Sequence, residues 1–283
     1  MVGDSETAEE FGELAMFGCA AHSSEIELFR ASIRKKTFPA HIHDGFIIAL
    51  VYEGVKAFDY RGARHYARAG DMVLLNPDML HTTQAATPDG VGYCTVQIPT
   101  GLMADYAAGD FFFDKPVLHA PALSEQMLAY FSMLEATNDA AVAQDEFDTF
   151  LTEFLALVQT GTTDPAGANA SSFDRRMSRI ADLIAASLDC NIAVTDLAEA
   201  VDLSRFHFLR VFKKHFGVAP HAYIQAQRTA KAKRLLAGGL SPIEAAMKTG
   251  FVDQSHLTRW MKACYGVTPG AYQALTNLRS KKA

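Results

Sequence analysis

The feature that most constrains the fold is an internal repeat near the C-terminus. Residues 206–223 and 255–272 align at an offset of 49, with eight of 18 positions identical. The identical pairs are His207 and His256, Arg210 and Arg259, Lys213 and Lys262, Gly217 and Gly266, Val218 and Val267, Pro220 and Pro269, Ala222 and Ala271, and Tyr223 and Tyr272. Similarity of this order indicates two copies of one supersecondary unit.

The first copy has the start and stop signals of a helix-turn-helix. Thr195 or Asp196 is expected to cap a short helix, and Ser204 to cap the next one. Gly217 can adopt the left-handed conformation that ends a helix, and Pro220 suits the first turn of the following helix. We therefore place the first unit at about residues 195–216.

The second copy repeats these signals. Ser241-Pro242 starts a short helix that ends near Thr249-Gly250, and Asp253 caps the next helix. Gly266 and Pro269 form the same ending, which places this unit at about residues 242–265. A helix from Pro220 to about Leu236 joins the units; its roughly 25 Å length lets two recognition helices approach successive major grooves, about 34 Å apart.

The free face of each second helix carries groups that can bind double-stranded DNA. Arginine pairs bidentately with guanine and glutamine with adenine, while lysine suits phosphates. The predicted DNA-binding residues are Ser204, Arg205, His207, Arg210, Lys214, Gln254, Ser255, His256, Arg259 and Lys262.

The charge is divided along the chain. Residues 1–174 hold nine basic and 25 acidic side chains, a net charge of −16, whereas residues 175–283 hold 17 and seven, a net charge of +10. A basic half is typical of a domain that faces nucleic acid. The small, polar segment from Gly161 to Ser172 predicts a linker close to this switch. We therefore expect domains at 1–160 and 175–283, with a linker at 161–174.

The N-terminal half shows β-prone runs followed by two helical segments. The runs Phe46–Tyr52, Val55–Tyr60, Met72–Leu75 and Gly92–Ile98 are separated by turn signals such as Glu53-Gly54, which is typical of a β-sandwich or small barrel. Residues 122–137 and 144–159 have helical periodicity. The second helix is strongly apolar and must bury one face on the barrel or on a second subunit, so a homodimer is expected.

The sequence contains no sign of export or membrane insertion. The N-terminus is acidic and polar, and the longest apolar run, near Ile47–Tyr52, is too short to span a bilayer. A cytoplasmic location is therefore expected, with no membrane partner. The four cysteines contain no CxxC pair and are expected to be reduced thiols.

The C-terminal region, from about Arg176 to Asn277, resembles the DNA-binding domain of AraC-type regulators. The resemblance rests on the segments LSRFHFLRVFKKHFGVAPHAYI, RTAKAKRLLAGG and TGFVDQSHLTRWMKACYGVTPGAYQ. Met261 and Ala246-Met247 depart from the family pattern at core positions. The resemblance implies a transcriptional regulator with a small-molecule sensor, and contact with RNA polymerase if the protein is an activator.

Residues 25–100 resemble the cupin barrel that AraC-type regulators use as a sensor. The expected fold is thus α+β: a cupin-like barrel with two helices, then an all-α domain with two helix-turn-helix units. His41 and His43 point the same way on a strand, and a later strand can bring His81 beside them. The predicted ligand-binding residues are His41, His43, Tyr52 and His81, with Tyr60 and Gln97 as further candidates.

Three imidazoles can also bind Zn, Fe or Mn, so His41, His43 and His81 are candidate metal ligands. Metal-binding cupins place a glutamate shortly after the second histidine, and here that ligand is missing unless Asp44 or Glu53 replaces it. The chain is expected to need no cofactor beyond such a metal. The segment YRGARHYARAGDMVLLNPDMLHTTQAATPDG resembles a subgroup associated with amino-acid export, which favours an amino acid or similar metabolite as effector.

Three functions remain open at this point. The first is a regulator whose DNA binding responds to an effector in the barrel, with no enzymatic activity. The second is a metal-dependent cupin enzyme, a dioxygenase or isomerase, fused to a DNA-binding domain; the missing glutamate argues against it. The third is a constitutive regulator whose barrel only dimerises.

Overall fold

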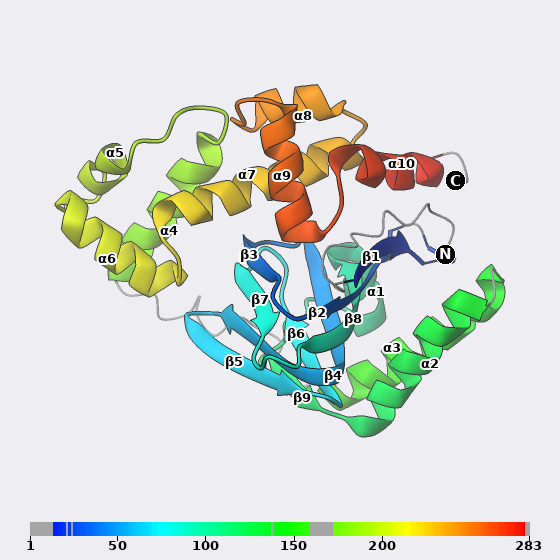
Figure 1. The fold of residues 1–283 in the computed structure, drawn as a ribbon. Helices are drawn as coiled ribbons and strands as arrows, with labels where there is room; N and C mark the ends of the chain where they lie inside the picture. Colours follow the sequence, from blue (N-terminus) through cyan, green and yellow to red (C-terminus); the bar gives the residue numbers. More distant parts are fainter. Residues whose placement is uncertain (1–13, 21, 24, 137–138, 159–171, 281–283) are drawn as a thin grey trace.

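The chain folds into a β-rich N-terminal domain and an all-helical C-terminal domain that lie against each other (Figure 1). The computed structural model describes residues 14–20, 22–23, 25–136, 139–158 and 172–280. The predicted α+β fold class is confirmed. Most of the linker expected at 161–174 lies outside the described residues, and the first C-terminal helix begins at Ser172.

The described part of the N-terminal domain contains nine antiparallel strands. They are β1 (Leu14–Cys19), β2 (Glu27–Ile33), β3 (Thr37–His41), β4 (Gly45–Tyr60), β5 (Ala63–Arg68), β6 (Asp71–Leu75), β7 (His81–Ala85), β8 (Val91–Pro99) and β9 (Val117–His119). The long strand β4 belongs to two sets of strands. Its first part pairs with β6 and β8, and its second part pairs with β5 and β7.

Strand β4 contains a β-bulge where the sequence predicted a turn. The runs Phe46–Tyr52 and Val55–Tyr60 form one strand, and its register with β8 shifts between Val51 and Glu53. Gly54 has a φ of +70°, and a Cβ atom there would lie 2.2 Å from the Gly90 carbonyl oxygen. The prediction of two strands was wrong because the glycine serves a bulge within a continuous strand.

The bulge also inverts which side chains face the barrel interior. Before it, Ile47 and Ala49 pack in the interior cluster, while Tyr52 packs on the opposite, helix-facing side. After it, Phe58 lies in the interior cluster and Lys56 lines the interior cavity. An extra residue reverses the alternation because side chains along a strand have a period of two.

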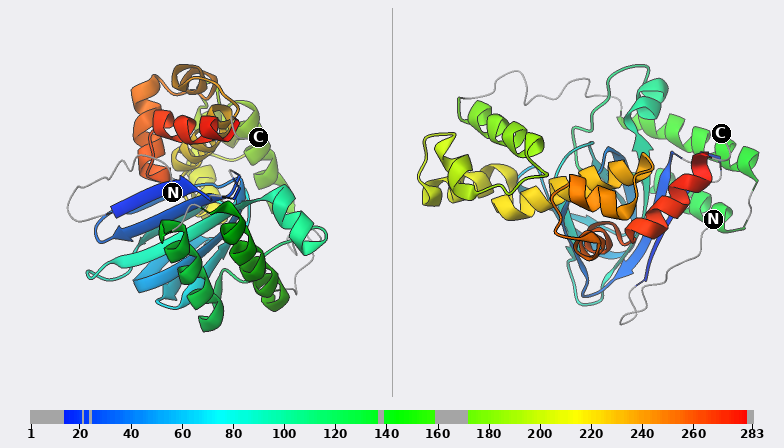
Figure 2. Two further views of the ribbon diagram at one scale, coloured as in Figure 1. Left: turned by 90° about the vertical axis from the view of Figure 1, so that its right-hand side faces the viewer. Right: turned by 90° about the horizontal axis from the view of Figure 1, so that it is seen from above.

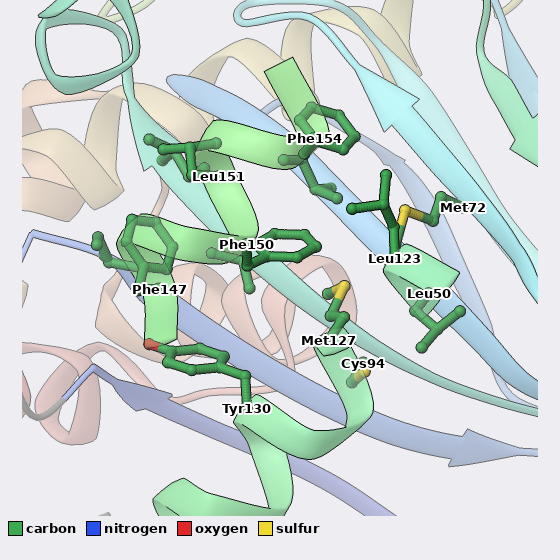
Figure 3. Close-up of a cluster of buried hydrophobic side chains, with 14 of the residues drawn as sticks. Leu50, Met72, Cys94, Leu123, Met127, Tyr130, Phe147, Phe150, Leu151 and Phe154 are labelled. Atoms are coloured by element: carbon green, nitrogen blue, oxygen red, sulfur yellow. The ribbon is translucent and has the colours of Figure 1, made fainter. Parts of the chain in front are cut away.

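Within the described residues, three helices accompany the sheet: α1 (Thr100–Ala107), α2 (Pro121–Ala136) and α3 (Ala140–Val158). The predicted helices at 122–137 and 144–159 correspond to α2 and α3. Figure 3 shows the cluster that joins them to the sheet, where aromatic side chains of α3 face Leu50, Met72 and Cys94. The apolar face of α3 is buried on its own barrel, so it no longer argues for a second subunit.

The C-terminal domain consists of seven helices in the described residues. They are α4 (Ser172–Ala186), α5 (Val194–Glu199), α6 (Arg205–Phe216), α7 (Pro220–Ala237), α8 (Pro242–Lys248), α9 (Gln254–Tyr265) and α10 (Pro269–Ser280). Helix α7 contributes Tyr223 and Ile224 to one apolar cluster and Ala232 and Leu236 to another. It therefore joins the two helix-turn-helix units, as predicted.

The two domains share a wide contact. Figure 2 shows the C-terminal helices over one side of the barrel, apart from α2 and α3. Strand β3 is packed against both α7 and α9. No helix within the described residues combines the length and the apolar character that crossing a bilayer requires.

Candidate functional site

The first recognition helix, α6, presents its polar face to solvent. The Ser204 side chain accepts from the His207 backbone N–H at its start, and Gly217 ends it with a φ of +77°. Both features were predicted. Helix α5 instead begins at Val194 after Ala193, without a side-chain cap, so the predicted cap at Thr195 or Asp196 was wrong. The predicted DNA-binding residues of this unit are all exposed: Ser204, Arg205, His207, Arg210 and Lys214.

The second recognition helix, α9, is built in the same way. Asp253 accepts from the His256 backbone N–H, and Gly266 ends the helix with a φ of +72°. The exposed predicted residues are Gln254, Ser255, Arg259 and Lys262. His256 is only half-buried, and its Nε2 accepts a hydrogen bond from Trp260 Nε1 at 3.1 Å. The Nε2 atom of His256 is therefore engaged within the helix. The backbone N–H of His256 is the group that Asp253 caps.

One strongly exposed residue at the start of α6 was not predicted. Phe206, at the start of α6, is 79% exposed, although large aromatic side chains are usually buried. An apolar side chain at this position suits contact with the methyl group of thymine. Its place between the polar residues Arg205 and His207 is the only sequence signal for it.

The interior of the barrel contains a cavity that both domains enclose. It spans about 540 Å³ of space not filled by atoms, including its open mouth. The barrel supplies most of its wall, and helix α9 supplies Cys264 and Tyr265. The lining residues are Phe17, Glu27, Phe29, Phe38, His41, His43, Ile47, Lys56, Leu75, His81, Thr83, Tyr93, Thr95, Gln97, Cys264 and Tyr265.

Three histidines meet on this wall, as predicted from the sequence. One ring nitrogen each of His41, His43 and His81 lies within 4.8 Å of the others. His41 comes from the end of β3 and is paired with His81 of β7. Burial lowers the pKa of all three, to about 4 for His41, with Lys56 adding to the effect there. The cluster is therefore neutral at pH 7.

Each imidazole in the cluster is held through its Nδ1 atom. Nδ1 of His41 lies 2.7 Å from the Pro39 carbonyl oxygen, and Nδ1 of His81 lies 3.2 Å from that of Met79. Nδ1 of His43 lies 2.7 Å from Gln97 Oε1. Because these oxygens only accept hydrogen bonds, each Nδ1 must donate, and each Nε2 keeps its lone pair for a ligand.

Two further predicted residues lie elsewhere. Tyr52 does not line the cavity, because the alternation before the bulge turns it to the helix-facing side, where it packs against Arg30. Tyr60 is buried and its hydroxyl accepts from Asn76 Nδ2. Gln97 does line the cavity, and its Nε2 donates to Asp44.

Neither carboxylate considered as a fourth metal ligand joins the histidines. Asp44 is exposed and bound to Gln97, and Glu53 is exposed at the bulge. In the part of the chain that the structure describes, the only metal-type cluster consists of the three histidines alone.

A buried ion pair fastens the two domains beside the cavity. Lys233 Nζ of α7 lies 2.6 Å from Glu27 Oε2 of β2, and both side chains are almost fully buried. The Tyr272 hydroxyl of α10 donates to Glu27 Oε1 at 2.9 Å. The Tyr265 hydroxyl of α9 donates to the Ile42 carbonyl oxygen at 2.7 Å. Three C-terminal helices are thus tied to the barrel around the cavity.

Comparison with known proteins finds a matching domain family for each half of the chain. A model of the AraC-like ligand binding domain matches residues 24–155, and a model of a helix-turn-helix domain matches residues 197–274. The chain is 27% identical to the uncharacterized HTH-type transcriptional regulator YbfI of Bacillus subtilis over 238 residues, which cover 82% of this chain and 86% of YbfI.

Two more distant proteins are similar over most of the chain. The XylDLEGF operon transcriptional activator of Pseudomonas putida is 22% identical over 235 residues, covering 78% of this chain and 72% of the activator. The fold is similar to that of Vibrio cholerae ToxT, solved with an unsaturated fatty acid bound, at a TM-score of 0.51, 16% identity and coverage of 90% and 96%. The sequence relatives are named as regulators, not enzymes. The chain belongs to the AraC-type transcriptional regulators, with an AraC-like ligand-binding domain followed by a helix-turn-helix DNA-binding domain.

Proposed function

We propose that the protein binds a specific operator in the cytoplasm and that a small effector in the barrel cavity changes its affinity for that operator. The observation that carries this proposal is the position of Tyr265. It is the last residue of the second recognition helix and also part of the cavity wall. An effector in the cavity therefore touches the helix that carries Arg259 and the other DNA-facing groups.

The proposed mechanism is a shift between two states of the domains. In the docked state, the Tyr265 hydroxyl is bonded to Ile42, and its ring lies 5.8 and 5.6 Å from those of His41 and His43. An effector that binds this state more tightly than the undocked one favours docking, and one that displaces Tyr265 favours release. Either change alters how freely α9 can be placed in the major groove.

The test is a mobility-shift titration of the operator with and without effector. Effectors are first identified by thermal shift across a metabolite panel, since a ligand that binds only the native state raises the melting temperature. Tyr265→Phe removes the bond to Ile42 and is expected to shrink the effector-dependent change in operator affinity. Tyr66→Phe is the matched control, because Tyr66 is exposed on β5. A bound effector that leaves operator affinity unchanged would contradict the proposal and favour a constitutive regulator.

A second candidate role for the histidine cluster is to bind a divalent metal such as Zn, Fe or Mn. The observation that favours it is the shared Nδ1 arrangement, since metal-bound histidines usually donate their other N–H to an oxygen. A bound metal would supply open coordination positions for atoms of the effector. Metal analysis of the purified protein beside His43→Gln tests this role, and a wild-type protein without stoichiometric metal would exclude it.

The remaining partners proposed from the sequence are an amino-acid effector, a second copy of the chain and RNA polymerase. The α-ammonium group of a bound amino acid carries three N–H donors that would need acceptors in the cavity. The amino-acid effector rests on sequence resemblance alone. Dimerisation and contact with RNA polymerase stay predictions. Sedimentation of the purified chain tests the first, and transcription from the operator with and without the chain tests the second.

A further inference from the structure

Lys56 is a buried cation on the cavity wall. It follows the bulge on β4 and is 4% exposed. Its Nζ lies 4.0 Å from the centroid of the Tyr93 ring, and among the described residues it has neither a hydrogen bond nor an ion pair. Burial lowers its pKa to about 7. An ammonium group in this position is costly unless an anion compensates it.

The chain itself does not supply that anion. Glu27 is the one acidic residue among the described lining residues. Its two carboxylate oxygens are bound by Lys233 at 2.6 Å and by the Tyr272 hydroxyl at 2.9 Å. Lys233 is therefore compensated within the structure, whereas Lys56 is not.

The remaining lining indicates what kind of anion fits. Apolar and aromatic side chains, including Phe29, Phe38 and Leu75, form much of the wall, and Thr83 and Thr95 add hydroxyl groups. The described lining contains one free ammonium group and no arginine, which suits a monoanion better than a phosphate, whose ligands are usually several cations or a helix N-terminus. An apolar wall likewise disfavours a small inorganic ion.

From this arrangement we propose that the effector is a small organic carboxylate with an apolar or aromatic body, and that Lys56 binds its carboxylate group. The inference rests on the proposed effector function and names the chemical class of the effector. It also disfavours an amino acid, because an α-ammonium group would need an acidic partner and Glu27 is already engaged by two donors.

The inference is tested by binding measurements on the full chain with matched ligand sets. The sets are 4-methylpentanoate with its amide and leucine, 3-phenylpropionate with its amide and phenylalanine, and benzoate with benzamide. Each compound is titrated by calorimetry and by thermal shift. At least one acid is expected to bind, and its amide and amino-acid counterparts to bind at least tenfold more weakly, because only the acid offers a charge-assisted bond without a second charge.

Two lysine variants make the test specific to the cavity. Lys56→Met keeps the length of the side chain but removes its charge, and is expected to weaken binding of the acid by roughly 10- to 100-fold. Without ligand, this variant should melt at or above the temperature of the wild type, since a buried uncompensated charge is gone. Lys115→Met is the matched control, because Lys115 is exposed in the sensor domain, and should bind like the wild type.

Several results would overturn the inference. They are unchanged binding of the acid by Lys56→Met, equal binding of an acid and its amide, no binding by any acid of the sets at millimolar concentration, and a Lys56→Met variant that melts well below the wild type. All four are read from binding or stability alone. Failure of the proposed function would give a different result: a ligand would bind in the cavity and leave the operator affinity unchanged.

Discussion

The buried pair between Glu27 and Lys233 allows a quantitative test of how the domains are held together. Glu27→Leu leaves the Lys233 ammonium without its carboxylate while the domains are docked, and the side chain of Lys233 is only 2% exposed. Breaking a buried pair from one side costs about 3–5 kcal/mol. Undocking returns Lys233 to water, so this cost falls on the docked state and not on the folding of either domain. A loss of 3 kcal/mol corresponds to roughly 150-fold in the docking equilibrium.

Amide hydrogen exchange of strand β3 reports this equilibrium, because β3 lies beneath α7 and α9. Its exchange is expected to accelerate by roughly 150-fold or more in Glu27→Leu. Exchange in β8, between β2 and β4, should stay unchanged. The double variant Glu27→Leu with Lys233→Met should recover most of the protection, because no charge is then left buried. Unchanged β3 exchange, equal acceleration in β8, or no recovery in the double variant would refute the reasoning.

Three further predictions concern the reading face, the bulge and the histidines. Replacing Arg210 and Arg259 together with alanine should abolish specific operator binding in a mobility-shift assay at fixed salt, with the helical content by circular dichroism unchanged. Gly54→Ala should destabilise the sensor domain by more than about 2 kcal/mol in denaturant titration, because the added Cβ meets the Gly90 carbonyl oxygen at a positive φ; a wild-type midpoint would count against a rigid bulge. The folded state holds His41 at a pKa of about 4, below its ordinary 6.5, so the unfolded chain binds more protons between these values and stability should fall as the pH drops through that window. The expected loss from pH 7.5 to pH 5 is about 2 kcal/mol from this group alone, and His41→Gln should reduce the pH dependence of unfolding.

The C-terminal domain was predictable because its signals are local. Ser204, Asp253, Gly217 and Gly266 each act within one turn of their own helix, and the structure places all four at the predicted helix ends. The start of α5 was misplaced because Ala193 precedes it without a side-chain cap, so nothing in the sequence marks that boundary.

The cavity was only partly predictable because its geometry depends on non-local contacts. The spacing of His41 and His43 indicated a shared strand face, and the pairing of β3 with β7 brought His81 to them. The assignment of Tyr52 to the cavity was wrong, because Tyr52 precedes the bulge on the strand face opposite Ile47 and Ala49. Tyr265 reaches the cavity from more than 200 residues away, through domain docking that no local pattern encodes.

The bulge in β4 makes the barrel sensitive to insertions and deletions of a single residue. With the bulge, the side chains after it that face inward include Lys56, Phe58 and Tyr60. Loss of one residue there would turn the alternate set inward, which contains Val55, Ala57 and Asp59. This part of β4 would thereby turn Asp59 inward in place of Lys56, while the aromatic lining residues on the other strands and on α9 would stay where they are. A one-residue deletion in this part of β4 is therefore expected to remove the lysine from the cavity wall while every side chain of the chain is kept.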